Sequence, residues 1–233
     1  MERGLAETRA KAQALILAGA VWSGEKKLDK AGTSVAEDVA LELRGRDHPW
    51  VSRGGIKLAH ALEHFRIDVA GAVALDIGAS TGGFTDVLLT KGARRVYAVD
   101  VGHGQLAWKL RQDPRVTVLE RVNARHLTAK EIPEPLDLVV CDASFIGLET
   151  VLPATLALAK PHASLIALIK PQFEVGPENV GKRGVVRDPA LHRTVSTRIA
   201  QWLEGRDWKV EGIAESPITG PEGNVEFLIY ASR

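Results

Sequence analysis

The sequence predicts an α/β protein: a mostly parallel sheet of seven strands with helices on both faces, preceded by a small α+β unit. Three observations lead to this fold class. From about Val51 onward, apolar runs of strand length alternate with stretches of helical periodicity, as in a largely parallel sheet. The last two apolar runs are joined only by the loop SPITGPEGN, which is too short for a crossover helix. Residues 1–46 lack the alternation.

The first 46 residues predict one helix and a few short strands. TRAKAQALILAG has helical periodicity, and Gly19 suits the end of that helix. The stretch 20–43 then indicates short strands joined by a Ser-Gly-Glu turn and a Lys-rich loop. We expect residues 47–51, with Pro49 among them, to link this unit to a second domain at 52–233.

The second domain alternates strands and helices in a fixed order. Because parallel neighbours need a crossover and the final pair has none, the last strand should be antiparallel. Strands are expected at 72–77, 95–100, 116–120, 137–142, 164–169, 208–215 and 225–231, and helices at 53–65, 83–91, 104–112, 147–159 and 189–204.

A glycine-rich turn follows the first strand of this domain, in the stretch LDIGASTGGF (75–84). Glycines allow the backbone to approach a ligand closely, and the helix that follows presents free N–H groups. The spacing is neither G-x-G-x-x-G nor a P-loop. Asp76, ahead of the glycines, suits a cationic ligand that carries hydroxyls, and S-adenosylmethionine meets that description. A tight turn with an exposed acid is the alternative.

A second acid, Asp100, closes the next strand, RRVYAVD. An acid at that place of a βαβ unit commonly binds ribose hydroxyls. The two acids together indicate a nucleoside-containing cofactor, but they do not separate a methyltransferase from a dehydrogenase.

Charged residues also close later strands. Asp142 ends LDLVVCD, Lys170 ends SLIALIK, and Glu226 precedes the last strand. Ligands bind beyond the carboxyl ends of parallel strands, so these groups should converge on one cleft with Asp76 and Asp100. Lys170 follows apolar residues and precedes a proline, which argues for a half-buried ammonium with a carboxylate partner.

Composition bounds the function classes. The chain has 233 residues, 45% hydrophobic and 25% charged, with a net charge of +1, so no global field indicates nucleic acid or membrane. Cys141 is the single cysteine, which excludes disulfides and a cysteine-based zinc site, and no metal is expected. With neither a signal peptide nor an apolar run long enough to span a membrane, a cytoplasmic protein is expected.

Five stretches together resemble the TlyA (haemolysin A) family: VSRGGIKL, LDIGASTGGF, CDASF, LIKPQFE and GNVEFLIY. That family combines an FtsJ-like ribose 2′-O-methyltransferase with a small N-terminal αL-type RNA-binding domain, which TRAKAQALILAGAVWSGEKKLDKAG resembles. The resemblance implies a Rossmann-like S-adenosylmethionine-dependent methyltransferase fold acting on ribosomal RNA in ribosomal subunits, as a monomer. It also implies that residues 1–46 form an αL-type domain without its usual Arg-Leu-Asp lead-in.

The resemblance further implies a Lys-Asp-Lys-Glu catalytic tetrad: Lys57, Asp142, Lys170 and Glu226. A ribose hydroxyl is a poor nucleophile, and a deprotonated lysine, Lys170 with Lys57 beside it, can take its proton as the methyl group transfers in line. The expected cofactor-binding residues are Asp76, Gly78, Ser80, Thr81, Gly82, Gly83, Phe84, Asp100, Asn123 and Asp142. The expected RNA-binding residues are Arg9, Lys11, Lys26, Lys27, Arg53, Lys182 and Arg183.

Other functions remain open at this stage. A base N-methyltransferase would often show Asp/Asn-Pro-Pro-Tyr/Phe where this chain has DASF, and a C5-cytosine enzyme would need Cys141 as its nucleophile. Strand alternation turns Cys141 away from Asp142, so we expect it in the core. A cytolysin, as the haemolysin name suggests, and a non-catalytic ribosome-binding factor are the remaining alternatives. The sequence offers no spanning segment and no signal for a cytolysin, and a pure binder has no use for the tetrad.

Overall fold

The computed structural model describes residues 4–6, 9–17, 19–28, 30, 32–36, 38–43 and 48–233. The chain divides into two units, Met1–Pro49 and Trp50–Arg233. The division falls inside the segment 47–51 that the sequence indicates as a linker.

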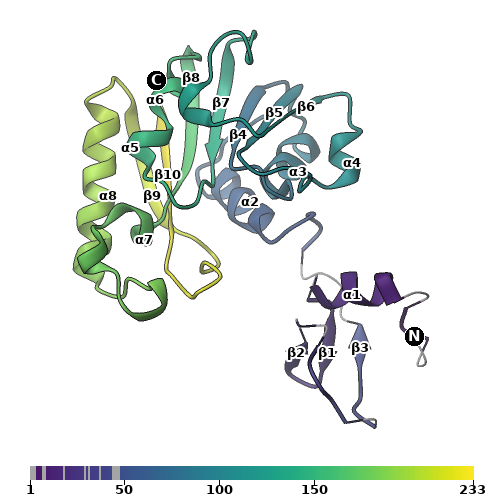
Figure 1. The fold of residues 1–233 in the computed structure, drawn as a ribbon. Coiled ribbons are helices and arrows are strands. Elements are labelled where there is room, and N and C mark those ends of the chain that lie inside the picture. The colour runs from purple at the N-terminus through teal and green to yellow at the C-terminus, as the bar shows by residue number, and fades with distance from the viewer. Residues whose placement is uncertain are drawn as a thin grey trace. The chain divides into compact units, whose positions relative to one another are not determined.

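The described residues of the N-terminal unit form one helix and a small antiparallel sheet (Figure 1). Its strand order is β2-β1-β3, and the buried residues Val21 and Leu28 pair across β1 and β2. The predicted helix and the hairpin at the Ser-Gly-Glu turn are both present. The elements are α1 (Arg9–Leu17), β1 (Val21–Ser23), β2 (Lys26–Leu28) and β3 (Glu42–Leu43).

The second unit is built on a seven-stranded sheet of order β6-β5-β4-β7-β8-β10-β9. The first five strands in this order are parallel, and β10 runs antiparallel to both β8 and β9. The predicted mixed sheet with a reversed last strand is therefore confirmed. The strands are β4 (Val73–Ile77), β5 (Arg95–Asp100), β6 (Val116–Glu120), β7 (Leu136–Cys141), β8 (Ala159–Ile169), β9 (Lys209–Glu215) and β10 (Phe227–Ser232).

Helices cover both faces of this sheet (Figure 1). Leucines of α2, α3 and α4 pack on one face, and apolar residues of α5, α6 and α8 pack on the other. Alternate residues of every central strand point to opposite faces of the sheet. Since helices cover both faces, the apolar residues on each side are almost completely buried. The helices are α2 (Gly54–His64), α3 (Gly83–Thr90), α4 (Trp108–Arg111), α5 (Leu148–Val151), α6 (Pro153–Leu156), α7 (Pro171–Glu174) and α8 (Pro189–Glu204), with 3₁₀ turns η1 (Ala124–His126), η2 (Pro177–Asn179) and η3 (Lys182–Gly184).

Two predicted helices are shorter than expected. The helix at 104–112 is only the single turn α4, because Ala107 is extended at its start. The helix at 147–159 is two single turns, α5 and α6, because Pro153 has no N–H to continue the hydrogen-bond ladder and starts a new turn instead. Strand β8 then begins at Ala159, five residues earlier than the expected 164.

Candidate active site

The chain turns sharply after β4, at the predicted glycine-rich turn. Gly78 and Gly82 have φ of 79° and 95°, and the amides of Gly78 and Ala79 both donate to the carbonyl of Val99 on β5. A Cβ at Gly78 would lie 3.0 Å from the Asp142 carbonyl and from Ala143 Cα, so no larger residue fits without backbone movement. The turn is thus held between the carboxyl ends of β5 and β7.

Asp100 fixes this turn from the neighbouring strand. Its Oδ2 accepts a hydrogen bond of 2.8 Å from the Ser80 amide, and its Oδ1 accepts one of 2.7 Å from the Gly102 amide. Ser80 itself has a φ of 47°, a left-handed conformation stabilised by this contact. The carboxylate therefore shapes the turn and also lines the cavity beside it.

Two cavities meet at the carboxyl ends of the strands. The larger, of about 690 Å³, contains five of the expected cofactor-binding residues in its lining: Gly78, Ser80, Asp100, Asn123 and Asp142. The smaller, of about 370 Å³, is lined by Thr81, Gly83 and Phe84 together with the whole expected tetrad. Gly78, Ser80 and Asp142 border both, so a ligand can extend from one into the other.

This arrangement fits S-adenosylmethionine. Ligand pockets of 300–1,000 Å³ hold molecules of that size. The larger cavity combines apolar walls from Val99, Val122 and Ile146 with the Asp100 carboxylate and the Asn123 amide, which suit a nucleoside. The glycine turn lets that ligand lie against the backbone. The smaller cavity would then receive the group that is methylated.

Asp76 and Gly82 are not in either lining, which differs from the expected direct contact. Asp76 faces α3 because of strand alternation; it is fully buried and its Oδ2 accepts a 2.6 Å hydrogen bond from Thr85 Oγ1. Burial raises the pKa of Asp76 to about 7. Gly82 instead packs on Leu106 and Leu110, which a Cβ there would strike. Both residues support the turn from beneath.

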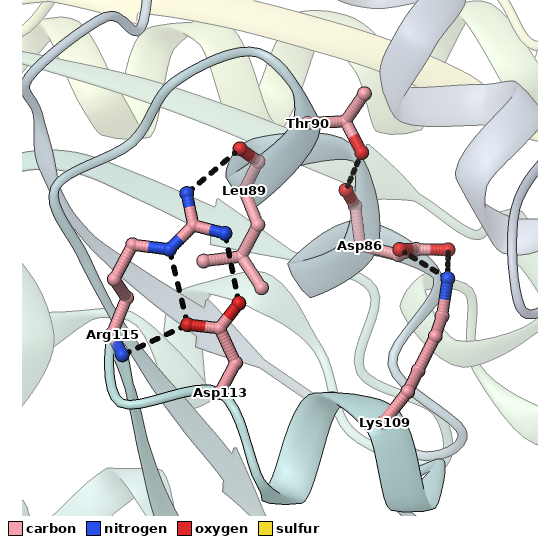
Figure 2. Close-up of polar contacts among 6 residues, drawn as sticks. All are labelled: Asp86, Leu89, Thr90, Lys109, Asp113 and Arg115. Atoms are coloured by element: carbon pink, nitrogen blue, oxygen red, sulfur yellow. Dashed lines mark hydrogen bonds and ion pairs between the residues drawn. The ribbon is translucent and has the colours of Figure 1, made fainter.

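Helix α3, which follows the turn, is held at both ends (Figure 2). Near its start, Asp86 accepts hydrogen bonds from Lys109 Nζ at 2.9 and 3.1 Å and from the Val51 amide at 2.8 Å. At its end, Arg115 donates to the Leu89 carbonyl and to both oxygens of Asp113. Hydrogen bonding from Arg115 lowers the pKa of Asp113. The helix and its turn are therefore anchored to the segment after β5.

The four tetrad residues come together in the smaller cavity. Lys57 Nζ lies 2.6 Å from Glu226 Oε2 and 3.8 Å from Asp142 Oδ2. Lys170 Nζ lies 2.6 Å from Asp142 Oδ1, and it also donates to the Asp142 carbonyl and to Ser144 Oγ, at 3.2 and 3.0 Å. Asp142 thus joins the two lysines, and the predicted carboxylate partner of Lys170 is Asp142.

Burial makes these contacts strong. Lys57 and Lys170 are each 6% exposed and Glu226 is 1% exposed. Two cations and two anions balance formally, as buried charges require. Strand ends supply three members, whereas Lys57 is supplied by α2, on the face that covers β4 and β10. Periodicity does not distinguish this lysine from a solvated one, and only the family resemblance indicated it.

Two aromatic residues at the cavity mouth were not among the expected site residues. Phe145 is 90% exposed with a φ of 64°, and its ring lies 5.0 Å from that of Phe173. Phe145 lines both cavities. An apolar side chain held open in a strained backbone is typical of a functional site. Its place three residues after the strand-end acid, in DASF, was the available signal.

Cys141 is in the core, as expected. It is fully buried among the residues under α5 and α8, and burial raises the pKa of its thiol to about 12. The thiol therefore cannot supply the thiolate nucleophile of a C5-cytosine enzyme.

The expected RNA-binding residues lie on three parts of the chain. Arg9, Lys26 and Lys27 are exposed on the N-terminal unit; Lys11 belongs to α1, but its side chain lies outside the described residues. Arg53 is exposed, lines the smaller cavity, and donates to the Thr219 carbonyl at 3.0 Å. Lys182 and Arg183 are exposed on η3.

Known proteins resemble this chain over nearly its whole length. The family model described as FtsJ-like methyltransferase matches residues 50–233. The 16S/23S rRNA (cytidine-2′-O)-methyltransferase TlyA of Mycobacterium tuberculosis is 50% identical over 231 residues, covering 99% of this chain and 86% of that protein. The chain belongs to the TlyA (haemolysin A) family of FtsJ-like methyltransferases. The expectation of an S-adenosylmethionine-dependent methyltransferase is thereby confirmed.

Two further relatives carry the haemolysin name. Hemolysin A of Brachyspira hyodysenteriae is 38% identical, covering 97% of this chain and 95% of that one. A solved structure from Streptococcus thermophilus that bears the name hemolysin aligns with a TM-score of 0.81 at 40% identity, covering 100% of this chain and 85% of that one. In the part of this chain that the structure describes, no helix is both long and apolar enough to cross a membrane. The same residues contain no cluster of three metal-binding side chains.

Proposed function

We propose that this protein methylates the 2′-hydroxyl of a ribose in ribosomal RNA, and that the modified nucleotide is a cytidine. The observation that carries the proposal is the buried tetrad in the smaller cavity, next to a nucleoside-sized cavity that shares Asp142 with it. The Mycobacterium tuberculosis relative, whose name gives cytidine-2′-O-methylation of 16S and 23S rRNA, supports the choice of substrate.

S-adenosylmethionine, when bound, supplies the electrophilic methyl group. Gly78, Ser80, Asp100 and Asn123 would hold it in the larger cavity. The turn needs no reorganisation to receive it, because Asp100 and the Val99 carbonyl already fix the turn's backbone. Such preorganisation keeps the hydroxyl and the methyl group in line, which accounts for much of the rate in reactions of this type.

In this proposal Lys170 takes the proton of the ribose hydroxyl. Asp142 and Ser144 fix its amine from two sides, so that a lone pair can be aimed at the hydroxyl once the ammonium has lost a proton. Lys57, held by Glu226 at 2.6 Å, contributes a second positive charge at Asp142. We assign Lys57 to nucleotide binding and to electrostatic support of Lys170.

Phe145 and Phe173 provide the surface on which the base of the target nucleotide can stack. A ribose in the smaller cavity requires its nucleotide to leave the RNA stack, and exposed aromatic rings offset that loss by stacking. The rings lie at the mouth of the same cavity as Lys170. This assignment explains why Phe145 is exposed.

Residues 1–46 are proposed to act as an αL-type RNA-binding domain, joined by 47–51 to the methyltransferase domain at 52–233. The exposed cations Arg9, Lys26 and Lys27 support this role, because phosphate contacts dominate non-specific affinity for RNA. Ribosomal subunits as partners imply a cytoplasmic location. A monomer is sufficient, because one chain lines both cavities.

The proposal is tested with labelled S-adenosylmethionine and isolated ribosomal subunits. Label should enter rRNA and should protect one ribose from alkaline cleavage, because methylation blocks the attacking 2′-hydroxyl. Lys170→Ala should lower turnover by about 10²–10⁴-fold. Lys170→Arg should fail as well, because a guanidinium does not deprotonate. Both variants should still bind the cofactor. Label on a base, or full activity in Lys170→Ala, would contradict the assignment.

A further inference from the structure

Residues 181–187, called the basic loop below, expose three cations that the proposed mechanism does not use. Lys182, Arg183 and Arg187 are exposed, and none forms an ion pair with another residue in the part of the chain that the structure describes. They line a hollow of about 600 Å³. The one acid in that lining, Asp188, is engaged as the N-cap of α8, where it accepts a 2.8 Å hydrogen bond from the Ala190 amide. The hollow is therefore suited to an anion.

Two buried polar side chains hold the basic loop in place. Asn224, 1% exposed, accepts a hydrogen bond from the Val186 amide at 3.0 Å and donates one to the Gly184 carbonyl at 2.9 Å. His192, 9% exposed, lies with Nε2 2.9 Å from the Val186 carbonyl, which can only accept. Both backbone groups of Val186 are thus bound by side chains from elsewhere in the chain. We call Asn224 and His192 the clamp.

The clamp connects the basic loop to the catalytic edge of the sheet. Asn224 lies two residues before Glu226 of the tetrad, and its carbonyl accepts the Gly220 amide at 2.9 Å. A Cβ at Gly220 would lie 2.8 Å from Glu226 Oε1, so this turn closes directly over the glutamate. Arg53 binds the same turn through the Thr219 carbonyl. One turn therefore sets the positions of the basic loop, Arg53 and the catalytic glutamate together.

We propose that the basic loop is a phosphate-binding wall for the RNA backbone flanking the target nucleotide, and that the clamp holds it at a fixed position relative to the tetrad. The inference rests on the proposed function for the identity of the anion. Asn224 and His192 are positioning residues, since each acts through the backbone of the loop. A rigid wall binds phosphates without the entropic loss of ordering a mobile segment, so its cations contribute more to binding.

The loop is tested by the salt dependence of binding to isolated ribosomal subunits. The binding constant falls with salt, so the slope of its logarithm against log salt is negative. Replacing Lys182, Arg183 and Arg187 together by alanine should make this slope less steep by about two to three, about one for each phosphate that is no longer neutralised. KM for the subunits should rise at least tenfold, while the dissociation constant of the cofactor stays unchanged. The charge-matched control, in which alanine replaces three exposed cations away from the cavities, should keep the wild-type slope and KM: Lys91, Lys130 and Arg206.

The clamp is tested by a double-mutant cycle. Asn224→Ala should raise KM for the subunits as the triple replacement does, and on the triple background it should change KM less than twofold, because the cations it positions are gone. His192→Leu should act in the same way, and His192→Gln, which keeps a donor for the Val186 carbonyl, should restore KM. This pair tests the clamp even where Asn224→Ala fails to fold.

Two outcomes would overturn the inference. One is a triple variant that keeps the wild-type salt slope and KM. The other is a clamp variant that raises KM on the triple background as much as on the wild-type background, or that changes the dissociation constant of the cofactor. Failure of the proposed function gives a different result, because the wild-type protein would then transfer no label to ribose at all.

Discussion

Asp76 gives a sharp test of how the cofactor turn is built. It is fully buried beneath the turn, with one carboxylate oxygen bonded to Thr85 Oγ1 and the other without a hydrogen-bond partner among the described residues. Burial, with Asp142 and Asp100 nearby as secondary causes, raises its pKa from 3.8 to about 7. Asp76→Asn keeps the size of the side chain and an acceptor for Thr85, and removes only the titration.

The sign follows from proton binding. Between pH 4 and 7 the folded protein holds a proton on Asp76 that the unfolded chain has released, so the free energy of unfolding falls as pH rises through this window. A pKa change from 3.8 to about 7 corresponds to about 4 kcal/mol. At pH 8, therefore, Asp76→Asn should be more stable than the wild type, by up to about 4 kcal/mol relative to any difference at pH 4.

The assay is urea unfolding followed by tryptophan fluorescence, with buried Trp208 as a reporter, at pH 5, 6, 7 and 8. Subtracting the free energy of unfolding of the wild type from that of the variant at each pH isolates the titration of Asp76 from that of all other groups. Asp113→Asn is the matched control, because the pKa of Asp113 is lowered in the folded protein. The stability that Asp113 contributes is therefore lost only when the pH falls below the pKa of this carboxyl in the unfolded chain. The difference in free energy of unfolding between Asp113→Asn and the wild type should be the same at every pH from 5 to 8. A flat difference for Asp76→Asn as well would refute the reasoning.

Three further predictions concern ligands. Calorimetry should show binding of S-adenosylmethionine and no binding of NAD. Gly78→Val should abolish binding of S-adenosylmethionine because the valine side chain would collide with the Asp142 carbonyl, and Asp100→Ala should weaken that binding. Phe145→Ala should raise KM for ribosomal subunits and lower turnover, because about 1–3 kcal/mol of base stacking is removed. Replacing four N-terminal cations by alanine should weaken RNA binding and make it less dependent on salt, without changing cofactor binding: Arg9, Lys11, Lys26 and Lys27. Unchanged affinity for RNA would show that these residues only form a solvated face.

The sheet could be predicted from the sequence because its central strands are buried on both faces. Such strands are continuous apolar runs, and each run of this kind in the second domain became a strand. Their limits lie within two residues of the expected ones, except that β8 begins five residues early. Helix lengths were less predictable. The apolar periodicity of 147–159 continues through Pro153, but the missing N–H of the proline divides the segment into two turns.

The site could be predicted where it depends on topology. Asp100, Asp142 and Lys170 each end a parallel strand, and parallel strands place their ends at one edge. Residues that reach this edge from helices and loops had no such signal. In the sequence Lys57 does not differ from any other helical lysine, and only the fold brings it to Glu226. Asn224 is a polar residue of a loop, and only the fold brings it to Val186. Contacts between segments far apart in the sequence decide both.

The charges of the tetrad account for its combination of burial and reactivity. With both lysines protonated, Lys57, Lys170, Asp142 and Glu226 carry no net charge, which suits a site so little exposed to water. Lys170 can act as a base only in its neutral form, and the four residues then carry a net charge of −1. Asp142 also borders the larger cavity, so the positive charge of S-adenosylmethionine bound there would compensate that charge. In the proposed reaction Lys170 takes up the hydroxyl proton, which returns the tetrad to zero, and bound S-adenosylmethionine would supply the methyl group and give up its positive charge. Net charge at the site is therefore the same before and after the reaction, and the protein need not reorganise around a new charge as the methyl group moves.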